Sequence, residues 1–123
     1  MAGRYALVVE DDPSVGELFR RALQDAGYQA DLMDNGHKAQ AQLAFTSPDL
    51  ILIDIHLPSF SGATLLRQVR GQQRLWHTRI IVVSGDKEAA KEYEPLADEV
   101  LVKPVGYEQL RQLAEQYIPA NVD

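Results

Sequence analysis

Short apolar runs separated by amphipathic stretches dominate the hydrophobic pattern of this chain. The runs are nearly continuous and rich in β-branched residues, which is typical of parallel strands buried on both faces of a sheet. A fifth run is weaker and more polar than the other four. The pattern predicts strands at Tyr5–Val9, Leu50–Ile53, Ile80–Val83 and Val100–Val102, with the weaker one at Gln29–Met33.

The stretches between these runs have helical spacing. Behind Pro13 and Ser14, apolar residues recur at positions 15, 18, 19, 22 and 23, and Gly27 ends the pattern. This spacing predicts a helix with one buried face. Alternation of strands and helices predicts an α/β domain with a central parallel sheet. Further helices are predicted at His37–Phe45, Thr64–Arg70, about Lys87–Tyr93 and Tyr107–Tyr117.

Composition narrows the class of protein. A length of 123 residues with 46% hydrophobic content fits one domain, residues 1–123, with a substantial core. The net charge of −6, without any run of Lys or Arg, argues against a nucleic-acid or membrane-surface partner. Cysteine is absent, which excludes disulfides and thiolate metal sites. The apolar runs are too short for a signal peptide or a membrane span, so we expect a cytoplasmic protein.

Charged and hydroxyl side chains follow four of the predicted strands. Because ligands of parallel α/β sheets bind outside the carboxyl ends of the strands, we expect these side chains to meet at one edge. Crowded carboxylates repel one another, and their oxygen atoms suit a hard cation such as Mg²⁺, or Mn²⁺ in its place. The set comprises Glu10, Asp11, Asp12, Asp54, Ser84 and Lys103.

Within this set, Asp54 is the candidate nucleophile. It ends a central apolar strand, where a metal ion and the Lys103 ammonium would both lie close to it. Two such cations can neutralise charge on the equatorial oxygens of a transferring phosphoryl group, and Ser84 adds a hydroxyl donor. The constellation therefore favours phosphoryl transfer to an aspartate.

Four motifs in this order, VVEDDP, LILIDIHLP followed by SG, IIVVSGD and LVKP, resemble the receiver domains of two-component response regulators over essentially the whole chain. The resemblance implies a CheY-like, flavodoxin-like fold of five parallel strands in the order 2-1-3-4-5 with five helices. It also implies phosphorylation by a histidine kinase, a phosphotransfer protein or a small phosphodonor. The signal would then pass by conformational change to a downstream protein target or to an output domain missing from this sequence.

The resemblance also assigns metal ligands. Asp54 matches the phosphoacceptor, which also contacts the metal, and Asp11 matches the direct metal ligand. Glu10 matches the acid that contacts the metal through water. His56 matches the position that contributes a backbone carbonyl oxygen to the metal.

Further matches concern the phosphoryl group and its hydrolysis. Ser84 and Lys103 match the hydroxyl and the lysine that engage the phosphoryl group. His56 and Asp86 match positions beside the hydrolytic water, so we expect them to influence dephosphorylation, either by bonding that water or by pairing with each other. Asp12 lies beyond the matched pair of acids and is expected to be solvated.

Departures from the family pattern leave a second function open. Val100 stands where receivers usually carry Tyr or Phe, and the segment between Ser84 and Lys103 is about one helical turn short, which predicts a shortened fourth helix. A phosphorylation-independent protein-interaction module is therefore the alternative. An FMN protein is disfavoured by the acids after the first strand, and a dehalogenase-type phosphatase by His56 where a second acid belongs. Trp76 is expected to be a packing residue.

Overall fold

A computed structural model describes residues 3–58 and 60–118 of the chain and shows strands and helices in strict alternation. Two short 3₁₀ helices, η1 and η2, interrupt the second half. The elements are β1 Arg4–Val9, α1 Pro13–Asp25, β2 Tyr28–Met33, α2 Gly36–Leu43, β3 Leu50–Asp54, α3 Gly62–Arg70, η1 Gln73–Leu75, β4 Arg79–Ser84, α4 Lys87–Lys91, η2 Glu94–Leu96, β5 Glu99–Val102 and α5 Tyr107–Gln116.

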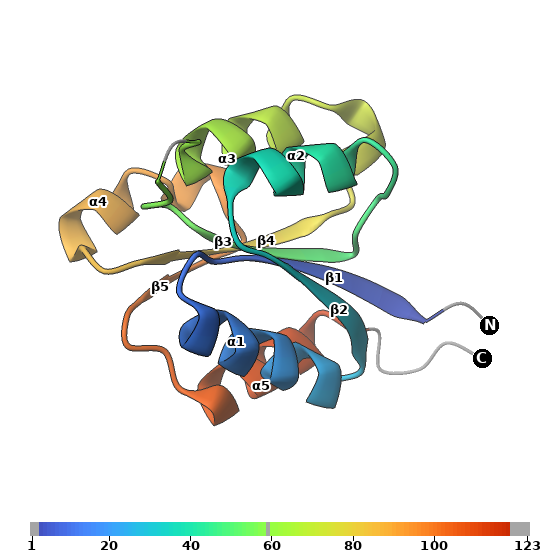
Figure 1. Cartoon of the computed structure of the whole chain (residues 1–123), viewed down its shortest axis with the longest axis vertical. Helices are drawn as coiled ribbons and strands as arrows, with labels where there is room; N and C mark the ends of the chain where they lie inside the picture. The colour runs from blue at the N-terminus through green and yellow to red at the C-terminus, as the bar shows by residue number, and fades with distance from the viewer. Residues whose placement is uncertain (1–2, 59, 119–123) are drawn as a thin grey trace.

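The five strands form one parallel sheet in the order β2-β1-β3-β4-β5. Helices α2 and α3 cover one face of this sheet, and α1 and α5 cover the other (Figure 1). The predicted flavodoxin-like fold and strand order are confirmed. Within the described ranges, no helix is both long and apolar enough to span a bilayer.

Apolar side chains fill the space on both faces of the sheet, which explains the continuous apolar runs. Successive residues of a strand point to opposite faces. In β1, Val8 packs with Phe19 of α1 and Leu110 of α5, whereas the neighbouring Leu7 packs with Leu66 of α3 on the other face. A strand that is buried on both faces cannot alternate with polar residues, so the pattern is apolar throughout.

The fourth helix is short, as predicted. α4 has five residues and ends at Lys91, two residues before the predicted end, and η2 completes the connection to β5. Val100 of β5 is half-buried, and it packs, like Tyr93 and Leu96, against the apolar cluster on the α2–α3 side of the sheet. The shortened connection thus folds back onto β5 through these apolar contacts.

Candidate functional site

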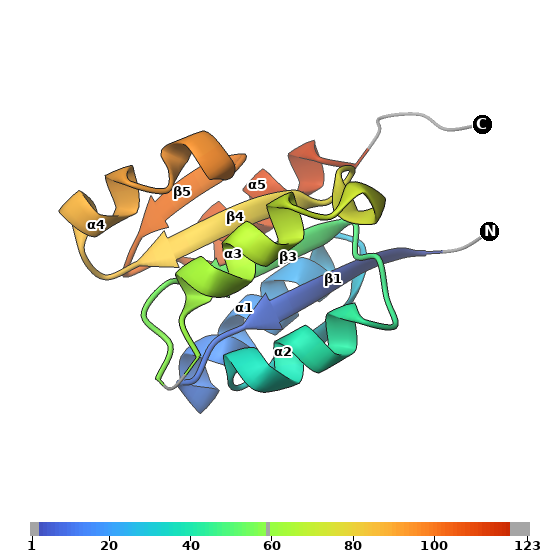
Figure 2. The same cartoon turned by 90° about the horizontal axis from the view of Figure 1, so that it is seen from above.

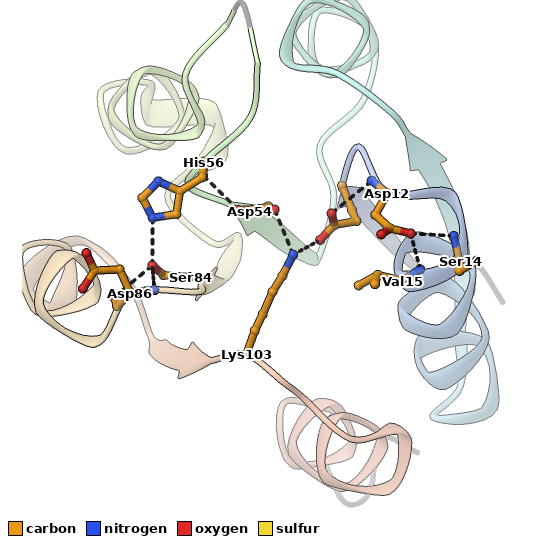
Figure 3. A network of polar contacts seen from close by, with 9 residues as sticks. Asp12, Ser14, Val15, Asp54, His56, Ser84, Asp86 and Lys103 are labelled. Atoms are coloured by element: carbon orange, nitrogen blue, oxygen red, sulfur yellow. Dashed lines mark hydrogen bonds and ion pairs between the residues drawn. The ribbon is translucent and has the colours of Figure 1, made fainter.

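The carboxyl ends of β1, β3, β4 and β5 meet at one edge of the sheet, because the strands are parallel. Asp54 and Ser84 are the last residues of β3 and β4, and Glu10 and Lys103 directly follow β1 and β5. Figure 3 shows the Lys103 side chain extending from the end of β5 toward Asp54. Side chains from four strands are thereby brought together, as the sequence predicts.

The Lys103 ammonium lies between two buried carboxylates. Its Nζ atom is 2.9 Å from Glu10 Oε1 and 3.0 Å from Asp54 Oδ2. Glu10 is 1% exposed and Asp54 is 4% exposed, so neither carboxylate has much contact with water. Buried carboxylates need such a partner. An ammonium from the far end of the chain therefore compensates for the acids that follow β1 and β3.

Burial and neighbouring charges change the pKa values of both Glu10 and Lys103. Burial lowers the pKa of Lys103, but hydrogen bonds and attraction from Glu10 and Asp54 outweigh burial, so the pKa of Lys103 is raised overall. Burial raises the pKa of Glu10, and the Lys103 ammonium and the Asp12 backbone N–H partly oppose that rise. Lys103 thus remains a cation at neutral pH.

Glu10, Asp11 and Asp54 also form a cluster of potential metal ligands. Each offers a carboxylate oxygen, and these atoms lie within 4.8 Å of one another, with Asp11 exposed at the rim. A set of oxygen donors on one open side fits a hard cation such as Mg²⁺, which keeps several waters and takes few carboxylates. The backbone N–H of His56 donates to Asp54 Oδ1 at 2.8 Å. The expected role of the His56 carbonyl oxygen as a metal ligand stays a prediction.

A contact between His56 and Ser84 was not expected from the sequence. His56 Nε2 lies 3.0 Å from Ser84 Oγ, and Ser84 is fully buried. Figure 3 shows the His56 ring pointing toward Ser84. Ser84 Oγ also accepts a hydrogen bond from the Asp86 N–H and lies within hydrogen-bond distance of the Asp86 carbonyl oxygen, both at 3.0 Å. Because Ser84 has one hydroxyl proton, it either donates to the Asp86 carbonyl and accepts from Nε2–H of His56, or donates to an unprotonated Nε2.

The Asp86 side chain does not pair with His56, which was one of the two arrangements considered from the sequence. Asp86 Oδ1 instead accepts from the N–H groups of Glu88 and Ala89 at 2.9 and 3.4 Å and caps α4. An aspartate just before a helix is a favoured cap, because its side chain satisfies free N–H groups of the first turn. Its side chain is thus held by the helix, and its expected role in hydrolysis stays a prediction.

Asp12 also has a local role that the sequence analysis missed. It is exposed, as expected, but its Oδ1 accepts from the N–H groups of Ser14 and Val15 at 2.9 and 3.1 Å and caps α1. Aspartate followed by proline is a recognisable helix start, so the signal was present in the sequence. Of the three consecutive acids, the buried Glu10 and the exposed Asp11 both belong to the ligand cluster, and Asp12 caps a helix.

Gly62 brings α3 close to the acceptor strand. A Cβ atom at this position would lie 2.2 Å from the Asp54 carbonyl oxygen and 2.8 Å from Ile55 Cα. No side chain is compatible with that approach, since the obstruction is backbone rather than a movable side chain. The serine–glycine pair of the sequence motif therefore has two structural roles. Ser61 caps α3, and Gly62 lets the start of α3 lie against the backbone of Asp54.

Comparison with known proteins identifies relatives of the whole described fold. The family model for the response regulator receiver domain matches residues 6–115. The DNA-binding transcriptional regulator NtrC of Salmonella typhimurium is 33% identical over 112 residues, which are 90% of this chain and 24% of NtrC. The chain thus spans about a quarter of the length of this relative.

Two solved structures agree closely with the fold. A CheY-like response regulator receiver domain from Methylobacillus flagellatus has a TM-score of 0.83 and 31% identity, and the match covers 94% of this chain and 99% of that one. The response regulator TrrA of Thermotoga maritima, in complex with Mg²⁺-BeF, has a TM-score of 0.82 and 27% identity, again over 94% and 99% of the two chains.

Proposed function

Because the chain belongs to the response regulator receiver domain family, we propose that it is a cytoplasmic phosphoacceptor that receives a phosphoryl group on Asp54. Residues 1–123 then act as one receiver domain that signals by its phosphorylation state. The observation that carries this proposal is the Lys103 ammonium 3.0 Å from Asp54 Oδ2, at the buried end of the central strand.

The proposed reaction is an in-line transfer. A carboxylate oxygen of Asp54 forms a bond to phosphorus while the bond between phosphorus and the donor, an imidazole nitrogen of a histidine kinase or phosphotransfer protein, breaks. Lys103 then pairs with the equatorial oxygens, and Ser84 donates its hydroxyl to one of them. Such positioning of charge is the main catalytic contribution that a protein makes to phosphoryl transfer.

The residues present fit a bound Mg²⁺. Asp11 and Asp54 would hold the ion, with the His56 carbonyl as a third ligand and Glu10 contacting it through water. When bound, the ion would neutralise charge on the transferring group and on the crowded acids. The structure of TrrA contains Mg²⁺-BeF, and that relative is 27% identical to this chain.

A hollow beside Lys103 supports docking of a protein donor. It has a volume of about 520 Å³ and is mainly apolar. Leu18 of α1 is 39% exposed at this hollow and adds apolar surface to its lining. We propose that a helix of the phosphodonor protein packs here. The lining residues are Val15, Leu18, Phe19, Gly85, Lys103, Pro104 and Val105.

Val100 and the short α4 favour a changed readout of phosphorylation. Valine has one preferred rotamer and cannot swing between a buried and an exposed position as an aromatic ring can. The signal to a downstream target or an output domain therefore travels by another route or with smaller amplitude. The alternative function, an interaction module that needs no phosphorylation, rests on the same two features.

Phosphoryl uptake separates these functions. Wild-type protein is incubated with acetyl phosphate and Mg²⁺, and intact mass is measured against Asp54→Asn and an Asp34→Asn control. Asp34 follows β2 at the same edge of the sheet but lies outside the site and pairs with Lys38. We expect one phosphoryl group on the wild type and on Asp34→Asn, and none on Asp54→Asn or with excess EDTA. Equal uptake by Asp54→Asn would disprove the assignment, and no uptake by the wild type would favour the interaction module.

A further inference from the structure

Helices α2 and α3, with the loops that follow them, form a surface from two segments that contain no Asp or Glu, which we name the α2–α3 face (residues 36–48 and 62–79). The two helices lie side by side on one face of the sheet (Figure 2). The two segments contain five basic residues and no Asp or Glu, although the whole chain has a net charge of −6. The acidic residues of the protein are therefore all elsewhere. The five basic residues are Lys38, Arg67, Arg70, Arg74 and Arg79, of which Arg79 lies over the Tyr117 ring on the α1–α5 side of the sheet.

Two large aromatic side chains are exposed at one end of this face. Phe45 follows α2 and is 88% exposed, and Trp76 follows η1 and is 66% exposed. The expectation that Trp76 is a packing residue is wrong. Both loops precede strands, β3 and β4, so they lie at the edge of the sheet opposite Asp54. Exposed aromatic rings are enriched where proteins bind partners, because they bury much area at little entropic cost.

Arg74 holds the two aromatic loops together. Its guanidinium donates to the carbonyl oxygens of Leu43 and Thr46, the latter at 3.0 Å, and to Ser47 Oγ at 3.4 Å. The loop that carries Phe45 is thereby tied to η1, the element just before Trp76. Groups that are already held in place lose little freedom on binding, which favours affinity.

A hollow of about 260 Å³ adjoins the Phe45 loop between α2 and α3. Leu43 and Ala44 supply apolar surface, and glutamine side chains supply amide donors and acceptors. Gln40 Nε2 and Gln68 Oε1, 3.0 Å apart, already bond across the two helices. The hollow thus combines apolar contact with neutral hydrogen-bonding groups. It is lined by Gln40, Leu43, Ala44, Gln68, Gln72 and Arg74.

The charge left free on the face is small. Three of the five basic side chains are already paired with carboxylates at distances of 2.9 to 3.3 Å. The Arg67 guanidinium lies over the Tyr93 ring at 5.8 Å, and Arg74 bonds to backbone carbonyls. Neither has a carboxylate partner within the described residues. Two such guanidiniums suit a few carboxylates, whereas a nucleic acid offers a long series of phosphates and needs many free cations.

We propose that the α2–α3 face is a docking surface for an acidic protein segment with apolar anchors. Apolar side chains of the segment pack on Phe45 and Trp76, and its carboxylates approach Arg67 and Arg74. Charge complementarity selects this occupant, because Arg67 and Arg74 have no carboxylate partner within the described residues and the two segments contribute no acid of their own. Phe45 and Trp76 lie at the edge of the sheet opposite Asp54, so binding does not depend on phosphorylation. This inference goes beyond the proposed function and does not rest on it.

The fluorescence of Trp76, the single tryptophan of the chain, measures binding at this face directly. The intact chain is titrated with a synthetic amphipathic helix of leucine and glutamate, with the same peptide carrying lysine for glutamate, and with a single-stranded oligonucleotide. We expect a saturable blue shift of Trp76 emission with the acidic peptide, weakened by added salt, and no shift with the lysine peptide. Affinity should be equal with and without Mg²⁺ and beryllofluoride.

Substitutions on the α2–α3 face test whether the acidic peptide binds there. Phe45→Ser and Arg67→Gln should each weaken the acidic peptide at least about fivefold, which one lost apolar or charged contact accounts for. Arg21→Gln, which removes an exposed guanidinium from α1 on the other face of the sheet, should change nothing. The proposal is overturned if millimolar acidic peptide leaves Trp76 emission unchanged, or if the oligonucleotide binds more tightly. Dimerisation by sedimentation velocity that Phe45→Ser abolishes would also overturn it, because the occupant would then be a second copy of the chain.

Discussion

Replacing Lys103 with methionine tests the charge balance of the site directly. Methionine keeps an unbranched apolar stem but removes the ammonium that contacts Glu10 Oε1 at 2.9 Å and Asp54 Oδ2 at 3.0 Å. Within the described residues, Glu10 then keeps one hydrogen bond, from the Asp12 N–H at 3.1 Å. Asp54 keeps the His56 N–H at 2.8 Å. A buried carboxylate is thereby left without its counter-charge.

The expected loss follows from burial. Removing one partner of a fully buried ion pair costs about 3–5 kcal/mol. The Lys103 side chain is 28% exposed, so water weakens the original pair, and a loss of about 2–3 kcal/mol at pH 7 is expected. For a domain of this size, 1 kcal/mol corresponds to about 4 °C, so the melting temperature should fall by about 8–12 °C.

The sign of the pH dependence follows from Glu10. Burial raises the pKa of Glu10 above its unfolded value, so the stability linked to Glu10 is present below the unfolded pKa and is lost as pH rises through the folded pKa. Removing the ammonium raises that folded pKa further. The deficit of the variant should therefore shrink as pH falls from 7 to 5, because Glu10 becomes protonated sooner in the variant than in the wild type.

Urea unfolding followed by circular dichroism, in EDTA at pH 7 and pH 5, measures both effects. Lys91→Met is the matched control, since Lys91 is exposed at the end of α4 and has no ion pair within the described residues. Adding Mg²⁺ should stabilise Lys103→Met more than wild type, because the ion supplies the missing positive charge. A loss below about 0.5 kcal/mol at pH 7, typical of a neutral surface change, would refute the reasoning, as would a loss that is equal at both pH values.

Three further changes test the neighbouring contacts. Gly62→Ala should lower the free energy of unfolding by about 3 kcal/mol, because a Cβ would lie 2.2 Å from the Asp54 carbonyl oxygen; a urea midpoint equal to wild type would contradict this. Asp12→Ala should cost about 1 kcal/mol through loss of the α1 cap, whereas Asp12→Asn should cost little in the same assay. His56→Ala should raise affinity for beryllofluoride up to about tenfold by calorimetry, since the Ser84 hydroxyl no longer has to leave the imidazole, and unchanged affinity would argue against that competition.

Local pattern alone determined the layers of the fold and the residues of the site. Continuous apolar runs identify strands buried on both faces, and parallel strands carry whatever follows them to one edge. The sequence therefore predicted that the charged and hydroxyl residues after four strands are neighbours, and their order along the chain matched a family pattern. These residues are Glu10, Asp54, Ser84 and Lys103. Helix ends were less well predicted. α4 ends at Lys91, and the short connection to β5 continues as the 3₁₀ helix η2 instead of as further α-helix.

Tertiary structure decided how these neighbours are used. The 2.9 and 3.0 Å contacts of Lys103 depend on how deeply Glu10 and Asp54 are buried, which no local pattern encodes. The His56 imidazole reaches Ser84 because the loops after β3 and β4 happen to lie side by side, and their sequence separation of 28 residues carries no sign of it. Exposure is likewise a property of the whole packing, because it depends on which segments cover a residue: Trp76 is an apolar residue, yet the fold leaves it 66% exposed.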